Sequence, residues 1–142
     1  MNWFKNIFSK KKNDEADDIV KEFNEHQQSI RDAGTSNGRH YTDTPEIVKQ
    51  LKREGRFGEA IEILLEAVES TENESKFAGE GWGVAPWYYE QLAIIYRKQK
   101  HYDLEVAILE RYLSQPKAPG VGPTKLSERL EKARQLLEKS QA

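Results

Sequence analysis

The feature that most constrains this chain is an internal repeat. The segment 54–66, EGRFGEAIEILLE, returns in modified form at 99–111 as QKHYDLEVAILER. In each copy an amphipathic run, a short polar turn with one aromatic residue, and a second amphipathic run follow one another. This pattern predicts two antiparallel helices packed across a tight turn, with Phe57 and Tyr102 filling the same corner in each copy. Repeated hairpins of this kind more often bind proteins than catalyse reactions.

Both copies resemble tetratricopeptide repeats over about residues 42–118. In the second copy the residues that fit the family pattern are Tyr89, Leu92, Ala93, Tyr96, Tyr102 and Leu109. In the first copy they are Ile47, Val48, Leu51, Gly55, Phe57, Ala60, Leu64 and Ala67. The resemblance implies an all-α fold of two such hairpins.

The chain departs from the family pattern in two ways. Tyr102 follows Phe57 by 45 residues, about 11 more than the roughly 34 of a tetratricopeptide repeat, and we expect the extra residues in the connection between the hairpins. Glu105 stands where the family has a small residue, which Ala60 supplies in the first copy.

Glu105 needs a polar partner if it lies between paired helices, because burying an unpaired carboxylate costs several kcal/mol. The candidate partners are Arg97 and the hydroxyl groups of Tyr89 and Tyr96. We favour a buried pair that tethers the hairpin. The alternative is a small-molecule-binding or enzymatic role centred on Glu105.

Length and composition indicate one small domain. The chain has 142 residues, of which 37% are hydrophobic and 32% charged, enough for a single core. It has no cysteine and no long apolar run, so we expect a cytoplasmic protein. The formal net charge of -2 gives no broad basic surface, and we expect no nucleic-acid partner.

The first 12 residues form a separate apolar and basic segment. They place Trp3, Phe4, Ile7 and Phe8 on one helical side, followed by Lys10, Lys11 and Lys12. This pattern is typical of a segment lying on an anionic membrane surface. The alternatives are a frayed terminus and an apolar plug docked on another subunit.

Residues 13–31 predict an amphipathic helix whose first turn is acidic. We expect it to cover the exposed flank of the first hairpin, because two repeats fall short of the roughly three needed for stability. Self-association through the same side, giving a homo-oligomer, is the alternative. Residues 32–44 are rich in Gly, Ser, Thr and Asn and predict a flexible linker ahead of Pro45.

The helical domain is expected over residues 45–140 and ends in a capping helix at about 124–140. Its apolar stripe is Leu126, Leu130, Ala133, Leu136 and Leu137. Proline and glycine residues at 116–123 separate this helix from the second hairpin.

The connection 72–86 is the first candidate binding surface. It combines glycines with Trp82 and leads into Trp87, so that large rings supply contact area where the backbone can approach closely. This connection and 116–123 should meet at one edge of the array and form a rim. The alternative is that both tryptophans fold back and seal the gap between the hairpins.

The second candidate surface follows from the family resemblance, which implies a groove lined by the first helix of each hairpin. The residues predicted to line it are Trp87, Glu90, Gln91, Ile94, Arg97, Lys98, Lys49 and Arg53. An acidic or mixed peptide would fit these side chains best, with Trp87 as an aromatic anchor.

No catalytic, phosphate-binding or metal-binding motif is present in the sequence, so we expect no enzyme activity and no cofactor. The sequence therefore predicts an all-α protein of two tetratricopeptide-like hairpins between an amphipathic helix and a cap. Its expected function is a protein-interaction adaptor for an unidentified protein or peptide. The main alternative is a peripheral adaptor held on a membrane by residues 1–12.

Overall fold

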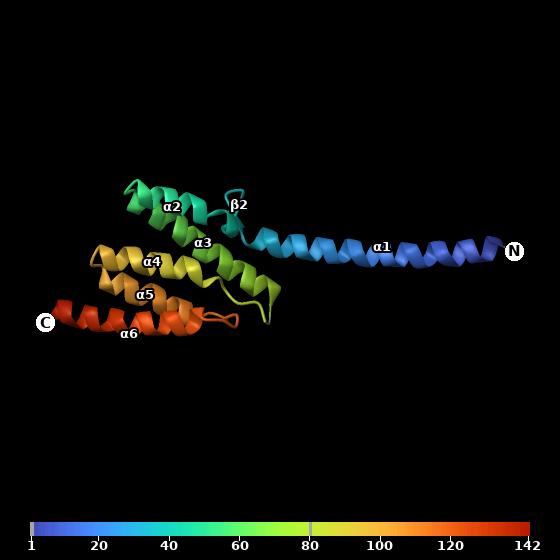
Figure 1. Cartoon of the computed structure of the whole chain (residues 1–142). Coiled ribbons are helices and arrows are strands. Elements are labelled where there is room, and N and C mark those ends of the chain that lie inside the picture. Colours follow the sequence, from blue (N-terminus) through green and yellow to red (C-terminus); the bar gives the residue numbers. More distant parts are fainter. Residues whose placement is uncertain (1, 80) are drawn as a thin grey trace.

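The computed structural model describes the backbone of residues 2–79 and 81–142, and the side chains of residues 14–79 and 81–142. Within these ranges the chain is all-α, as predicted, with six α-helices and one very short two-stranded sheet (Figure 1). The helices are α1 (Asn2–Ala33), α2 (Pro45–Arg53), α3 (Phe57–Ala78), α4 (Pro86–Lys98), α5 (Tyr102–Leu113) and α6 (Gly122–Gln141). Helices α2 to α6 pack side by side, and α1 projects away from them (Figure 1).

Helix α1 joins the predicted 1–12 segment and the predicted 13–31 helix into one element. No glycine or proline interrupts the chain until Gly34, which directly follows the last helical residue. The side chains of Trp3, Phe4, Ile7, Phe8, Lys10, Lys11 and Lys12 lie outside the described residues, and the membrane-surface prediction for them stays a prediction.

Most of the described part of α1 does not pack against the bundle. Every residue from Asp14 to Ser29 is exposed, and Ile30 is the first buried one. Ile19, Val20 and Phe23 are 67%, 57% and 61% exposed. The prediction that this apolar side covers the first hairpin is therefore wrong, because α1 leaves the bundle before these residues can reach it.

The segment 32–44 is folded and is not a flexible linker. Strands β1 (Thr35–Ser36) and β2 (Arg39–His40) pair antiparallel around Asn37 and Gly38, whose φ angles are 52° and 76°. Positive φ at both central residues is what a two-residue hairpin turn of type I′ requires, and Asn-Gly is its preferred sequence. A 3₁₀ turn, η1 (Tyr41–Asp43), then leads into α2.

The two helical hairpins, α2–α3 and α4–α5, turn in the same way. Gly55 and Lys100, at equivalent positions of the two repeat copies, have φ angles of 72° and 61°. The next residue in each turn donates its backbone N–H to a carbonyl five residues back: Arg56 to Leu51 and His101 to Tyr96. The repeated sequence therefore corresponds to a repeated backbone conformation.

The connection predicted at 72–86 is shorter than expected, because α3 continues to Ala78. Most of the extra residues between the hairpins extend this helix, and only 79–85 form the connection. The buried polar residues Glu72, Glu74 and Ser75 lie in this extension. Gly79, with φ of 85°, follows its last residue.

The core is formed by helices α2 to α6 together and is rich in tyrosine. Tyr89 and Tyr112 are its largest fully buried side chains. Leu126, Leu130 and Ala133 of the predicted apolar stripe of α6 are buried against it, and Leu136 and Leu137 are half-buried. Val84 and Lys117 form an isolated parallel bridge, so the connections 79–85 and 114–121 meet at one edge, as predicted.

Candidate partner-binding surface

The residues predicted to line the groove on α4 make contacts within the chain. Glu90 pairs with Lys125 of α6 at 3.2 Å, and Gln91 accepts a hydrogen bond of 2.8 Å from Lys52 of α2. Trp87 and Ile94 are half-buried, and the Trp87 ring meets that of Tyr88 edge to face at 5.2 Å. This side of α4 is therefore used in part to connect neighbouring helices.

The basic residues of the predicted groove are also engaged locally. The Lys98 ammonium lies 4.7 Å from the centre of the Phe57 ring. Lys49 pairs with Glu46, and Arg53 donates to Gln50, both within α2. All three basic side chains remain exposed to solvent.

Glu105 is fully buried, and its partner is Arg97, as one of the predictions proposed. The Nε atom of Arg97 donates to both carboxylate oxygens, at 3.0 and 2.8 Å. Arg129 of α6 brings a second guanidinium to 3.4 Å, which the sequence did not indicate. Burial, and then repulsion from Arg97, lowers the pKa of Arg129. The cluster links α4, α5 and α6 and leaves Glu105 out of reach of a substrate in this conformation.

Glu72 forms a second buried cluster. Arg111 of α5 donates to its two carboxylate oxygens, each at 2.8 Å, and the Tyr89 hydroxyl donates to one of them at 2.9 Å. Burial, and then the Glu72 charge, raises the pKa of Tyr89. The hydrogen bond to Glu72 likewise raises the pKa of Arg111. A two-point contact of this kind fixes the orientation of α5 against α3.

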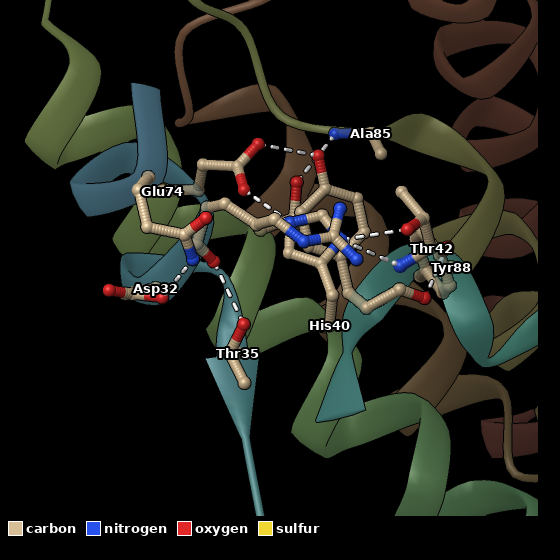
Figure 2. Close-up of polar contacts among 11 residues, drawn as sticks. Asp32, Thr35, His40, Thr42, Glu74, Ala85 and Tyr88 are labelled. Atoms are coloured by element: carbon tan, nitrogen blue, oxygen red, sulfur yellow. Dashed lines mark hydrogen bonds and ion pairs between the residues drawn. The ribbon is translucent and has the colours of Figure 1, made fainter. Parts of the chain in front are cut away.

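The third buried carboxylate, Glu74, joins the β-hairpin to α3 (Figure 2). The backbone N–H of Thr42 donates to Nδ1 of His40 at 3.3 Å, which leaves Nε2 of His40 to donate to Glu74 at 2.5 Å. The Tyr41 hydroxyl donates to the other Glu74 oxygen at 2.9 Å. Burial, and then Glu74, raises the pKa of Tyr41 to about 12.

Gly34 packs directly on the His40–Glu74 pair. A Cβ atom at Gly34 would overlap Oε2 of Glu74 and lie 2.8 Å from Nε2 of His40. The backbone N–H of Tyr41 also donates to the Gly34 carbonyl at 3.1 Å. The end of α1 is thus held against α3 through the hairpin. The sequence signal for this arrangement is the Asn37-Gly38 pair, which is typical of a two-residue hairpin turn.

An open pocket of about 340 Å³ lies beside this cluster. Its lining comes from α1, β2, α3 and the 79–85 connection: Gln27, Gln28, Ile30, Arg31, His40, Glu74 and Trp82. Trp82 is 40% exposed, whereas Trp87 is half-buried against the core. The predicted binding residue Trp82 therefore stands at the junction of α1 with the bundle.

Exposed apolar side chains gather around the same junction. Phe77, at the end of α3, is 51% exposed and lies 6.3 Å from the His26 ring of α1, measured between ring centres. Ile19, Val20 and Phe23 continue the apolar side of α1 outward from there. We call residues 14–25 of α1 the α1 overhang. Exposed apolar side chains grouped along one helical side are typical of an interaction surface.

The chemistry of the described residues adds two findings. No three His, Cys, Asp or Glu side chains among them are grouped so that they could hold a metal ion. No helix within the described ranges combines the length and apolar character needed to cross a bilayer.

Comparison with protein-family models, with curated proteins and with solved structures gave no match.

Proposed function

We propose that this chain is a non-catalytic protein-interaction module that binds a partner protein through the α1 overhang. The supporting observation is the exposure of Ile19, Val20 and Phe23 on a helix that projects from the bundle (Figure 1). Helices in proteins gain most of their stability by packing an apolar side against a neighbouring element. A partner that covers these residues would supply that packing.

The surface extends from the α1 overhang to the bundle. Phe77 and Trp82 are large, partly exposed rings at the end of α3 and in the connection that follows. Rings of this kind supply much of the binding free energy at protein interfaces. A partner lying on the overhang would reach both of them and the pocket beside His40.

A non-catalytic role is supported by the fact that each buried carboxylate already has a basic partner within the chain. Glu72, Glu74 and Glu105 each bind an arginine or a histidine of the same chain. Groups paired in this way link neighbouring elements of the bundle. The hairpins resembling tetratricopeptide repeats would then serve as the folded body that presents α1.

We place the interface on the α1 overhang in preference to the predicted groove. Arg97 and Glu90 already form ion pairs within the chain, and a ligand would have to compete with Glu105 and Lys125 for them. Ile19 and Phe23, by contrast, are 67% and 61% exposed to solvent in the part of the chain that the structure describes.

Site-specific photo-crosslinking tests this proposal. Benzoylphenylalanine would replace Phe23 in one variant and Leu104 in another, since Leu104 is an exposed apolar residue on α5, 43% exposed. We expect one specific crosslinked protein from position 23 in a lysate of the source cells, and its loss when Ile19→Glu is added. The same products from both positions, or none from position 23, would overturn the proposal.

A further inference from the structure

The apolar side of the α1 overhang is the outward continuation of the α1–α3 contact. Ile30 is buried, and His26 lies against Phe77 of α3. Steps of three or four residues along a helix stay on one side, so Phe23 and then Ile19 follow His26 and Ile30 on this side. Helix α3 ends at Ala78, however, and Phe23 and Ile19 remain 61% and 67% exposed.

Carboxylates border this apolar side. Residues 14–25 contain six acidic residues and one lysine, a formal net charge of -5. Glu15 and Glu22 lie one helical turn on either side of Ile19, and Asp17 lies three residues from Val20. An apolar strip between acidic edges is complementary to an apolar strip between basic edges.

From these two observations we infer that the α1 overhang binds a basic amphipathic helix of a partner protein. The partner helix would extend the line of α3 beyond Ala78 and pack against Ile19, Val20 and Phe23, with lysines or arginines facing Glu15, Glu22 and Asp17. This inference rests on the proposed function and adds the chemistry of the partner.

The acidic residues that border the apolar strip also favour a basic helix over two other possible partners, a second copy of the chain and a lipid surface. A second copy aligned in parallel would bring another overhang of net charge -5 against the first, and like charges side by side are destabilising. An anionic lipid surface would repel these carboxylates, whereas it would attract Lys10, Lys11 and Lys12 of the neighbouring segment. A basic helix gains from both the apolar strip and the charges.

Synthetic peptides test the inference directly on the full chain. The probe is a fluorescent amphipathic peptide of about 18 residues with leucines at helical spacing and lysines on both flanks. A matched peptide carries glutamates in place of the lysines, and a third has the basic composition in scrambled order. Binding is measured by fluorescence anisotropy at low and high salt.

We expect the basic amphipathic peptide to bind, more weakly at high salt, and the acidic and scrambled peptides to bind at least about tenfold less tightly. Phe23→Ala should weaken binding about tenfold, while Leu104→Ala should leave it unchanged. Phe23 is exposed, so its replacement does not endanger the fold, which circular dichroism would verify. Equal binding of the scrambled peptide, or equal loss in both variants, would overturn the inference.

A charge exchange provides the sharper control. The double variant Glu15→Lys with Glu22→Lys should transfer preference from the basic to the acidic peptide. Asp18→Lys with Glu25→Lys changes the net charge equally at positions that are not three or four residues from Ile19, Val20 or Phe23, and should not transfer it. Identical behaviour of the two double variants would show that only net charge matters and would also overturn the inference.

Two further measurements would show whether a second copy of the chain or a lipid surface covers the apolar strip instead. Sedimentation velocity that shows a dimer lost in Phe23→Glu would assign the strip to a second copy. Flotation with phosphatidylserine vesicles that is lost in Phe23→Glu would assign it to lipid. If crosslinking at position 23 succeeds while the peptides fail, the proposed function stands and the partner chemistry is wrong. If crosslinking also fails, the proposed function is wrong as well.

Discussion

Gly55 and Lys100 occupy the same position in two successive helical hairpins, and both adopt a left-handed backbone, with φ of 72° and 61°. Glycine adopts this conformation without steric cost, whereas lysine does so at about 1–2 kcal/mol. The two turns therefore share one geometry, and only the first has the residue type that suits it. The strain at Lys100 is the cost of preserving the turn.

The turn can be tested by exchanging the residue types. Lys100→Gly should raise the free energy of unfolding by up to about 1 kcal/mol, because the gain in the folded turn exceeds the added freedom of the unfolded chain. Gly55→Ala should lower it by about 1 kcal/mol, since nothing lies within 4 Å of the added methyl group and only the backbone is strained. Urea unfolding measures both. Destabilisation by Lys100→Gly would contradict the argument.

The Glu105 cluster predicts that substitutions at two glutamates of α5 have very different effects on the free energy of unfolding. Glu105→Gln should lower the free energy of unfolding by about 3–5 kcal/mol, because Arg97 and Arg129 would keep their charges without a counter-ion. Glu110→Gln is the control, since Glu110 pairs with Arg134 at the surface, and should cost less than about 1 kcal/mol. Similar losses in the two variants would show that the buried charge is unimportant.

Removing the whole cluster should reverse much of that loss. A triple variant with Glu105→Ala, Arg97→Met and Arg129→Met leaves no buried charge without a partner, and apolar replacements of ion clusters are often neutral in stability. We expect the triple variant to be more stable than Glu105→Gln alone in the same urea titration. A further loss would contradict this account.

The anchoring of α1 can be tested at Gly34. In Gly34→Ala the new methyl group would displace the His40–Glu74 pair, and we expect a loss of about 1–3 kcal/mol. Trypsin should also cleave faster at Arg31 and Arg39. Gly58→Ala is the matched control, because its Cβ would meet nothing within 4 Å in helix α3, and it should stabilise by about 1 kcal/mol.

The tyrosines predict a loss of stability at high pH. Burial raises the pKa of both Tyr41 and Tyr88 from 10.0 to about 12, and for Tyr41 Glu74 adds to the effect. Between these values the unfolded chain loses phenol protons that the folded chain retains, so the free energy of unfolding falls as the pH rises. Below pH 10 these groups add no pH dependence. Urea unfolding at pH 9 and pH 11 measures the fall, which should be smaller in Tyr88→Phe.

The sequence predicted what depends on local periodicity. The spacing of Leu126, Leu130 and Ala133 was sufficient to predict α6, and the echo between 54–66 and 99–111 was sufficient to predict both hairpin turns. The equivalence of Glu105 with Ala60 indicated a buried carboxylate, and Arg97, one of its three candidate partners, is the one that binds it. Each of these inferences needed only residues close in sequence or at equivalent repeat positions.

The remaining buried clusters depend on residues distant in sequence. Glu74 meets His40 from 34 residues away, and Glu72 meets Arg111 from 39 residues away. Without these partners, the polar run 72–78 is typical of a connection, which is why the extension of α3 was missed. The course of α1 was missed for a related reason, since an amphipathic pattern shows that one side is apolar but not what covers it.

Helix α1 is attached to the bundle at its C-terminal end, so a small change of angle there produces a large displacement of its outer part. At 1.5 Å per residue, Asp14 stands about 30 Å from Ala33, so a tilt of about 10° at the attachment would displace Asp14 by about 5 Å. The angle of α1 is set where Gly34 packs closely on His40 and Glu74. Any molecule bound near Asp14 would thus have its position relative to the bundle set by three residues that it does not touch.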